Sequence, residues 1–415
     1  MEPGTVVTAD VNAVLDDEEL DIVVEVIGGT GYPASDLVLK SAARGKSVVT
    51  ANKALLAHAL PSVRRAFNSR RRALGFEASV AGGIPIIRAL QHSLLPDSIT
   101  SVQGILNGTS NFILSSMAGG KPFAQALGEA QQAGFAEADP TADVEGHDAA
   151  NKLVLLTQLA FGHYVPPPQV RTLGITGITP FDVHAALASG FAIKHLGVST
   201  LFDAPRGAAV AAAAAAAAVE GGGEGPAAPR LQRRLLDVFV SPALVPLGSP
   251  LATTGGAGNL VQVDSLALGR TSYGGAGAGR EPTANSVLAD LVAIAKRTVP
   301  SRPFPRPPPA RVGLSVKPSP TLQREMFVRG PAPLANLLSA ALWRQGRDFA
   351  PCSGGNGGGG GGGGSSGGAV VKAFRVDASA AELASLIARA ARKVGGGAEA
   401  EAQLVKDTVF YPIIQ

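Results

Sequence analysis

The chain has 415 residues, enough for two or three domains, and 46% of them are hydrophobic, which allows a sizeable core. The formal net charge is +4, but the arginines form short clusters without interleaved aromatic residues, so the sequence does not support a nucleic-acid-binding surface. The single cysteine, Cys352, excludes an intramolecular disulfide and any multi-cysteine metal site. No run of apolar residues is long enough to predict a membrane span, so neither nucleic acid nor a membrane is expected as a partner.

The first part of the chain alternates between predicted strands and helices. A β-branched run at residues 22–27 is typical of a buried parallel strand and ends at a pair of glycines. Helical spacing over 34–43, a second strand at 47–50 and a helix–strand unit over 55–78 follow. This βαβαβ pattern predicts a parallel sheet with right-handed crossovers.

Longer helices and further strands are expected in the middle of the chain. The predicted helices cover 84–95, 122–133, 147–161 and 286–295, and the predicted strands cover 101–106, 238–245 and 260–268. Residues 273–279 predict a glycine-rich turn. Residues 205–230 are low in complexity and predict a disordered or weakly helical insertion, and the proline-dense stretch near 300–310 predicts a linker.

The tail from residue 311 predicts a small βα sandwich that a glycine tract interrupts. Its predicted helices cover 334–343 and 379–394, and its predicted strands cover 370–376 and 409–414. The tract at 354–364 has Asn356 as its one break and predicts a flexible loop.

The segment from 137 to 152 contains five carboxylates and one lysine, directly before an apolar run. A helix that begins near Gly146 would place Asp148 and Lys152 four residues apart on one face. An acid beside a base at the entrance of an apolar helix is one way to obtain a positioned proton donor. The plainer alternative, which spacing alone leaves equally open, is an acidic helix N-terminus with an ordinary i,i+4 ion pair.

Two of the predicted strands end in residues that suit ligand binding, because ligands dock at the carboxyl ends of strands in open α/β sheets. Gly28 and Gly29 end the first strand, and Thr50 and Lys53 lie at the end of the second. A lysine there suits a phosphate or a carboxylate. A simple turn and a solvent-facing lysine are the plainer explanations.

Two loops have the composition of ligand sites. Glu77 and the small residues up to Ile84 offer one charged oxygen and several backbone carbonyls, which suits a hard cation, although a capped glycine turn also explains them. The glycine-rich stretch 275–279 lets the backbone approach a flat or charged ligand, although a plain turn is the simpler explanation.

Together these segments resemble the homoserine dehydrogenase family. The resemblance covers about residues 10–298 and rests on six phrases in family order: VVEVIGG, GKSVVTANKALLA, FEASVAGGIPII, GILNGTSNFIL, EADPTADVEGHDAANKL and GAGREPTANSVLADL. It implies the NAD(P)H-dependent reduction of L-aspartate 4-semialdehyde to L-homoserine, an oxidoreductase step in threonine, methionine and isoleucine biosynthesis. The implied cofactor is NADP or NAD, the implied assembly is a homodimer, and the implied location is the plastid stroma or the cytoplasm.

The resemblance also implies roles for individual residues. Lys152, Asp148 and Lys53 are the implied catalytic residues, with Lys152 donating a proton to the nascent alkoxide. The residues implied to bind substrate are Glu137, Asp143, Asp148, Gly108 and Thr109. Those implied to bind the cofactor are Gly28, Gly29, Thr50, Lys53, Gly277 and Gly279. A sodium ion is implied at Glu77 with the backbone carbonyls of Val80, Gly82 and Ile84.

The family layout implies an α/β fold class: an incomplete Rossmann-type parallel sheet, an α+β substrate and dimerisation domain, and a small degenerate ACT-like α+β tail. The partial NAD(P)-binding domain would comprise 1–83 and 274–298, the substrate domain 84–273, the linker 299–310 and the tail 311–415. The ligand turn of ACT domains is missing from this tail. Threonine inhibition is therefore only a hypothesis.

The largest departure from the family pattern concerns the phosphate-binding turn. No Gly-x-Gly-x-x-Gly turn precedes the first family strand, so the chain is interpreted as N-terminally incomplete and is expected to bind NAD(P)H poorly. Phe135 replaces a common tyrosine, and Ala276 replaces a common proline. The alternative function is a catalytically inactive subunit that modulates an intact partner. A semialdehyde dehydrogenase working through a thioester would need Cys352, which lies beside low-complexity sequence.

Overall fold

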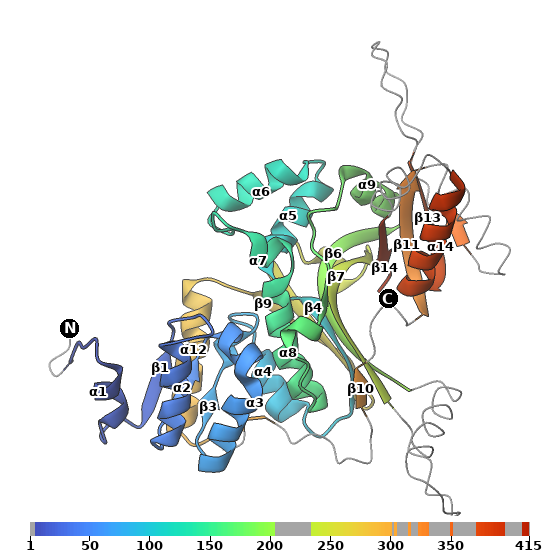
Figure 1. Cartoon of the computed structure of the whole chain (residues 1–415). Helices are drawn as coiled ribbons and strands as arrows, with labels where there is room; N and C mark the ends of the chain where they lie inside the picture. The colour runs from blue at the N-terminus through green and yellow to red at the C-terminus, as the bar shows by residue number, and fades with distance from the viewer. Residues whose placement is uncertain are drawn as a thin grey trace, which may run out of the picture.

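The computed structural model describes residues 5–203, 234–300, 303–304, 314–316, 323–331, 349–351, 371–394 and 409–414. The low-complexity insertion, the expected helix at 334–343, the glycine tract and Cys352 all lie outside these residues. The described residues confirm an α/β architecture with one parallel, one mixed and one antiparallel sheet (Figure 1).

The first sheet confirms the predicted βαβαβ unit. Strands β1 (Ile22–Glu25), β2 (Ser47–Thr50) and β3 (Leu74–Gly75) are parallel and adjacent in that order. Helices α2 (Ala34–Ala43) and α3 (Lys53–Arg70) connect them, and α1 (Val11–Asp16) precedes them. Helix α12 (Arg280–Ala295) returns from much later in the sequence and packs on β2 and β3.

Strand β1 ends two residues before the predicted end at residue 27. The N–H groups of Ile27 and Gly28 donate to Oε1 of Glu25 at 2.8 and 3.1 Å, so they turn away from the strand direction. Val26 and Ile27 are 67% and 55% exposed, which a buried strand would not allow. The side chain of Glu25 therefore ends the strand and begins the glycine turn.

The second sheet is mixed and forms the centre of the molecule. It follows the order β10-β7-β6-β4-β8-β9, with β5 pairing in parallel with β7. Its strands are β4 (Ile99–Ile105), β5 (Arg171–Thr172), β6 (Phe191–Asp203), β7 (Arg234–Pro246), β8 (Gly258–Ser265), β9 (Gly269–Ala276) and β10 (Leu314–Val316). Strands β6 and β7 pair along their whole lengths, from Phe191 opposite Pro246 to Asp203 opposite Arg234.

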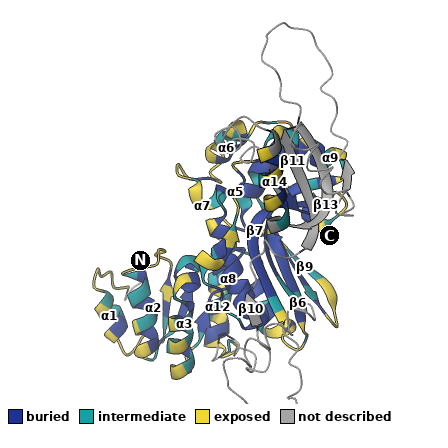
Figure 2. Cartoon of the chain, turned by 45° about the vertical axis from the view of Figure 1, so that its right-hand side comes forward, coloured by how far each residue is buried: buried dark blue, intermediate teal, exposed yellow. Residues whose placement is uncertain are grey.

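Helix α8 (His147–Phe161) joins the two sheets. It contacts α3 of the first lobe and β4, β6 and β7 of the second. Residues Leu153 to Leu156 are fully buried, so this part of the helix is buried on all sides, and Figure 2 shows it dark blue beside the central sheet. The helices α5 (Gly108–Ala118), α6 (Phe123–Gln132), α7 (Thr141–Val144), α9 (Pro180–Ala188) and α11 (Pro250–Thr253) complete this lobe.

The helix expected at 84–95 is shorter and irregular. The 3₁₀ helix η1 (Glu77–Ser79) precedes α4 (Ile86–Arg88), which continues as the π-helix η2 (Ala89–Ser93). Pro85 has no N–H to donate, and the Glu77 carboxylate accepts the N–H groups of the next helical turn, so the helix begins there. A further single turn, η3 (Pro167–Gln169), precedes β5.

The prediction of a turn at 273–279 was wrong over its first half. Strand β9 runs to Ala276 in antiparallel pairing with β8, where Gly274 lies opposite Leu260. Glycine is a weak strand former, but the ladder to β8 overrides that preference. Helix α12 likewise begins at Arg280 rather than at 286, because Pro282 falls in the first turn, where a missing N–H is harmless.

The third sheet confirms most of the predicted tail elements. Strands β11 (Gln323–Pro331), β12 (Phe349–Pro351), β13 (Val371–Ser379) and β14 (Val409–Pro412) are antiparallel in the order β12-β13-β11-β14. Helix α14 (Ala380–Val394) follows β13. This strand order is that of a split βαβ sheet of the ferredoxin-like type. The end of the chain docks on the central sheet, where the N–H of Ile414 donates to the Leu244 carbonyl at 2.8 Å.

The proline-dense stretch after α12 contains one firmly packed residue. Phe304 is 2% exposed and its ring lies 5.1 Å from that of Phe76. The carbonyl of the preceding Pro303 accepts a hydrogen bond from Gln91 at 2.7 Å. Within the part of the chain that the structure describes, no helix is both long and apolar enough to cross a membrane.

Replacing Phe304 by alanine should lower the free energy of unfolding by about 3 kcal/mol, because it removes a buried ring and leaves a cavity beside Phe76. Phe202→Ala is the matched control, since Phe202 is 38% exposed and should cost less than about 1 kcal/mol. Urea unfolding of both variants measures the difference. Equal effects of the two substitutions would show that Phe304 does not anchor this segment.

Candidate active site

The entrance of α8 brings the predicted acid and base together. Gly146 caps the helix with a φ of 84°, a left-handed conformation that favours glycine. A Cβ at this position would lie 2.9 Å from the His195 ring, so the close approach also requires glycine. Asp148 in the first turn and Lys152 in the second then share one face, as the spacing predicted.

Lys152 and Asp148 form a buried ion pair. The Lys152 Nζ lies 2.6 Å from Asp148 Oδ2 and donates to the Leu106 carbonyl at 2.8 Å. Lys53 Nζ lies 3.1 Å from the other oxygen, Asp148 Oδ1. The side chains of Lys152 and Asp148 are each 10% exposed, whereas that of Lys53 is 41% exposed. One carboxylate therefore bridges a buried and a half-exposed ammonium group.

The two carboxylates of the site have opposite pKa shifts. Burial alone would raise the pKa of Asp148, but the ammonium groups of Lys152 and Lys53 and the hydrogen bonds from Lys152 and Asn107 hold it well below its usual range. Burial raises the pKa of Asp143, and a hydrogen bond from Asn107 only partly opposes this. Two neighbouring carboxylates whose pKa values are shifted in opposite directions are typical of sites that need one ionised acid and one more readily protonated acid.

A cavity of about 990 Å³ opens onto the ion pair. The residues expected at the substrate all line it, as do the two glycines expected under the cofactor: Lys53, Gly108, Thr109, Glu137, Asp143, Asp148, Lys152, Gly277 and Gly279. The Thr109 hydroxyl donates to the Phe135 carbonyl at 2.6 Å and ties this part of the wall together. The structure thus brings the expected catalytic and substrate-binding residues to one cavity.

The glycine loop between β9 and α12 forms one wall of this cavity. A Cβ on Gly277 would lie 2.0 Å from Cγ of Asn259, and a Cβ on Gly82 would lie 2.7 Å from the Gly277 carbonyl carbon. Gly83 N–H also donates to the Ala276 carbonyl at 3.0 Å. The backbone of this loop therefore packs directly against the Asn259 side chain and against the backbone at Gly82.

A buried lysine that sequence reasoning missed holds the segment leading into β8, from which Ala257 and Gly258 line the cavity. Lys194 on β6 donates to the Thr254 carbonyl at 2.7 Å and to Asn111 Oδ1 at 3.0 Å. The Asn111 amide donates to the carbonyls of Thr254, Gly256 and Gly258 at 2.9 to 3.1 Å. Burial lowers the pKa of Lys194 to about 8. No local sequence signal indicates this contact, because the two residues lie 83 positions apart.

The residues expected at the carboxyl ends of β1 and β2 form a second polar cluster. Gly28 and Gly29 have φ angles of 84° and 79°, as a tight turn requires. The Thr50 hydroxyl donates to Glu25 Oε2 at 2.6 Å, and Asn52 Nδ2 donates to the Gly29 carbonyl at 2.8 Å. These residues do not line the 990 Å³ cavity, but Asn52 is the N-cap of α3, whose first residue, Lys53, reaches Asp148.

The Glu77 carboxylate is buried and accepts two backbone hydrogen bonds. It is 4% exposed, and its two oxygens accept the N–H groups of Ile87 and Arg88 at 2.8 and 2.9 Å. The carbonyls of Gly82 and Ile84 also accept internal hydrogen bonds, from the Ser286 hydroxyl and from Ile86 N–H. Carboxylate and carbonyl oxygens that accept one hydrogen bond each have a further lone pair, so the expected sodium site at Glu77 and these carbonyls stays a prediction.

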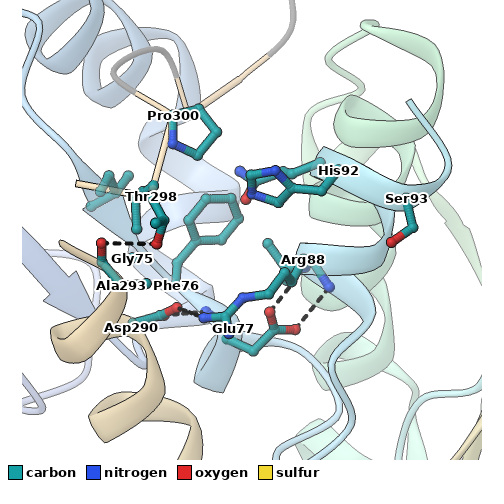
Figure 3. Close-up of a pocket in the computed structure, with 14 residues that line it drawn as sticks. Gly75, Phe76, Glu77, Arg88, His92, Ser93, Asp290, Ala293, Thr298 and Pro300 are labelled. Atoms are coloured by element: carbon teal, nitrogen blue, oxygen red, sulfur yellow. Dashed lines mark hydrogen bonds and ion pairs between the residues drawn. The ribbon is translucent and has the colours of Figure 1, made fainter. Parts of the chain in front are cut away.

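Glu77 lines a smaller cavity of about 330 Å³ behind this loop (Figure 3). There the guanidinium of Arg88 lies 3.2 Å from Asp290 Oδ1, and the other oxygen of Asp290 accepts the Glu77 N–H at 2.8 Å. Burial raises the pKa of Glu77 to about 7, although the two backbone hydrogen bonds oppose it. Among the described residues, no group of three or more histidine, cysteine or acidic side chains could hold a metal ion.

Fold and cavity together define a class of protein. A parallel sheet of the nucleotide-binding type is joined by one buried helix to a mixed sheet, and a lysine–carboxylate pocket lies beside their junction. This is the arrangement of a two-domain α/β dehydrogenase.

Comparison with known proteins identifies the family. The homoserine dehydrogenase family model matches residues 85–292, and the model of the homoserine dehydrogenase NAD-binding domain matches residues 1–77. The chain therefore belongs to the homoserine dehydrogenase family.

Relatives of known name agree with this. Homoserine dehydrogenases from Mycobacterium tuberculosis and Pseudomonas aeruginosa are both 43% identical, over 72% and 71% of this chain. The match spans 62% and 61% of their own lengths, so the chain spans about three fifths of these curated relatives.

Solved structures show the same architecture. A homoserine dehydrogenase from Thiobacillus denitrificans has a TM-score of 0.76 at 32% identity, covering 98% of this chain and 85% of that one. The enzyme from S. aureus has a TM-score of 0.66 at 29% identity, covering 98% and 84%. These matches include the third sheet, which lies beyond the family model.

The raised pKa of Glu77 gives a prediction for stability against pH. Its folded pKa of about 7 exceeds the unfolded value of 4.5, so the folded state binds more protons between these values. The free energy of unfolding should therefore fall as pH rises from 5 to 8, by on the order of 3 kcal/mol from this group. Glu77→Gln should flatten that decline.

Urea unfolding at pH 5 and pH 8 measures the effect. Glu129→Gln is the control, because the Glu129 pKa is shifted in the opposite direction, downward, by its hydrogen bond from Lys121. An unchanged slope in Glu77→Gln would show that Glu77 is ionised throughout this range.

Proposed function

We propose that this chain carries the catalytic residues for the NAD(P)H-dependent reduction of L-aspartate 4-semialdehyde to L-homoserine. The observation that carries the proposal is the buried Lys152–Asp148 pair, linked to Lys53 and open to a cavity that Glu137 also lines. Family membership supports the same reaction. The chain spans only part of its curated relatives, so the activity is an inference about its site.

Lys152 is suited to donate a proton to a developing alkoxide. An ammonium group has three N–H donors. Asp148 and the Leu106 carbonyl accept two of them, which within the described residues leaves one for the cavity. Reduction of the aldehyde adds a hydride to its carbon and a proton to its oxygen. When bound, a reduced nicotinamide supplies the hydride. Lys152 gives the proton and becomes a neutral amine.

Asp148 prepares Lys152 for this step. The ionised carboxylate orients the ammonium group at 2.6 Å and stabilises its charge in a buried position. Because Asp148 is also bound by Lys53 and Asn107, it keeps its place after Lys152 has lost its proton. The transfer leaves a neutral hydroxyl on the product and a neutral amine on Lys152, while Asp148 remains paired with Lys53.

The remaining lining residues suit the two ends of an amino-acid semialdehyde. Glu137 is exposed at the cavity, where its carboxylate can bind the substrate ammonium group. Asp143 is its half-buried counterpart. Gly108 and Thr109 begin α5 and line the cavity, so their backbone N–H groups, which lack helical partners, are candidate donors to an anion there.

The glycine loop fits the flat ring of a nicotinamide. Residues 275–279 present only glycine and alanine to the cavity, which lets a planar group approach the backbone. A continuous contact path supports a cofactor that extends from there towards β1. It runs from the Gly29 carbonyl through Asn52 to the start of α3, and from Lys53 to Asp148.

Three finer expectations remain proposals that rest on the family resemblance. These are NADP or NAD as the particular nicotinamide cofactor, a sodium ion at Glu77 with the carbonyls of Val80, Gly82 and Ile84, and a homodimer through the substrate domain. Enzyme assays with each cofactor, assays with sodium replaced by a large organic cation, and light scattering would test them separately.

Replacing Lys152 by alanine should lower kcat for semialdehyde reduction by about two to four orders of magnitude, because the proton donor is lost. The affinity for the nicotinamide should change little. Stopped-flow reduction and a fluorescence titration of the cofactor measure the two quantities.

Lys40→Ala is the matched control. Lys40 also forms an i,i+4 ion pair, with Asp36 at 2.8 Å, but its side chain is 48% exposed and far from the cavity lining. The control should keep its activity. A Lys152→Ala variant that retained more than a tenth of the wild-type rate would contradict the proposed function.

A further inference from the structure

Asn107 lies where β4 passes into α5, and its side chain makes three hydrogen bonds. Its Oδ1 accepts the N–H of Ser110 at 2.8 Å and so caps the helix. Its Nδ2 donates to Asp143 Oδ1 at 2.6 Å and to Asp148 Oδ2 at 2.9 Å. The residue is 5% exposed. Because the cap needs the amide oxygen, the NH₂ group can only face the two carboxylates.

The Asn107 amide thus bridges two carboxylates, those of Asp143 and Asp148, that would otherwise repel each other. Two neighbouring carboxylates disfavour each other's ionised form. Here one NH₂ group donates to both, and the oxygen of Asp148 that it binds is also the one that binds Lys152. The position of Asp148 relative to Lys152 therefore depends on Asn107 as well as on the helix.

The chain around Asn107 reinforces the same geometry. The preceding residue, Leu106, accepts a hydrogen bond from Lys152 at 2.8 Å. Ser110, one turn later, donates its hydroxyl to the Asp143 carbonyl at 2.8 Å. A single strand–helix junction therefore fixes Lys152, Asp148 and Asp143 together.

The charged groups that face this junction come from several elements. Lys53 belongs to α3, Asp143 to α7, and Asp148 and Lys152 to α8. The other titratable residues that line the cavity are Glu137, Asp139 and His147. Within this set, only Asp143 and Asp148 accept hydrogen bonds from Asn107.

We propose that Asn107 is a positioning residue of the reduction, whose amide holds Asp148 against Lys152 and Asp143 beside that pair. This inference rests on the proposed function and deepens it. Asn107 does not transfer the proton. It sets the geometry and the charge of the groups that do.

Two substitutions separate this role from helix capping. Asn107→Ser and Asn107→Asp both keep a side-chain oxygen that caps α5, since serine and aspartate are as good at the N-cap as asparagine. Both lose the donated NH₂ group. Asn107→Asp also adds a third carboxylate to the site. Asn12→Asp is the control for charge, because Asn12 is exposed on α1.

In the full chain, kcat should fall about tenfold in Asn107→Ser and about a hundredfold in Asn107→Asp, with an unchanged cofactor affinity. The acid limb of the pH–kcat profile should move to higher pH in both, by about one pH unit or more in Asn107→Asp, because the ionised acids lose a donor. Asn12→Asp should behave as wild type. Two variants that match the wild type in kcat and in the acid limb would show that Asn107 only caps the helix.

A second measurement does not need turnover. Carboxyl ¹³C resonances of labelled aspartate, assigned with Asp143→Asn, report the titration of Asp143 directly. Its midpoint should move to higher pH in both Asn107 variants, and an unmoved midpoint would overturn the proposal. If the wild-type chain does not reduce the semialdehyde, the proposed function fails, whereas this titration still decides the role of Asn107.

Discussion

The buried ion pair of Lys152 and Asp148 is the interaction on which the rest of the site depends. Transferring two charged groups from water to the protein interior costs free energy. Their mutual attraction offsets this cost only when the geometry is good and further hydrogen bonds are made. The protein supplies these from three directions: the Leu106 carbonyl, the Asn107 amide and the Lys53 ammonium group. The fully buried helix α8, the β4–α5 junction and the start of α3 must therefore meet at one point. The fold is organised so that they do.

Close backbone contacts provide the second constraint. Gly146 lets α8 begin against His195, and Gly82 and Gly277 let the loop after β3 touch the loop after β9. None of these three positions has room for a side chain, so the segments on either side of each contact can approach closely. The lysine–carboxylate cluster and the glycine loop both line the resulting cavity.

Several features of the fold and the site could be predicted from the sequence, and those that could not have physical reasons. The i,i+4 spacing of Asp148 and Lys152 fixes their common face locally, and the β-branched runs identify β1 and β2.

The role of Asn107 was missed, although its place before Gly108 and Thr109 is a typical N-cap signal, because its two acidic partners lie 36 and 41 residues away. The full length of β9 was missed because glycine favours turns locally, while the ladder to β8 is a long-range interaction. The groups that the Glu77 carboxylate contacts could not be predicted from the sequence, because they depend on how α4 packs against it.

Proton transfer from the Lys152 ammonium group is the central claim, and chemical rescue of Lys152→Ala tests it most directly. The rate of semialdehyde reduction by that variant would be measured with increasing concentrations of small primary amines at fixed pH. The account predicts that the rate rises with the concentration of the protonated amine and saturates, since the ammonium ion takes the place of the missing side chain beside Asp148. A rate that no primary amine raises, in a variant that folds and binds cofactor as the wild type does, would contradict it.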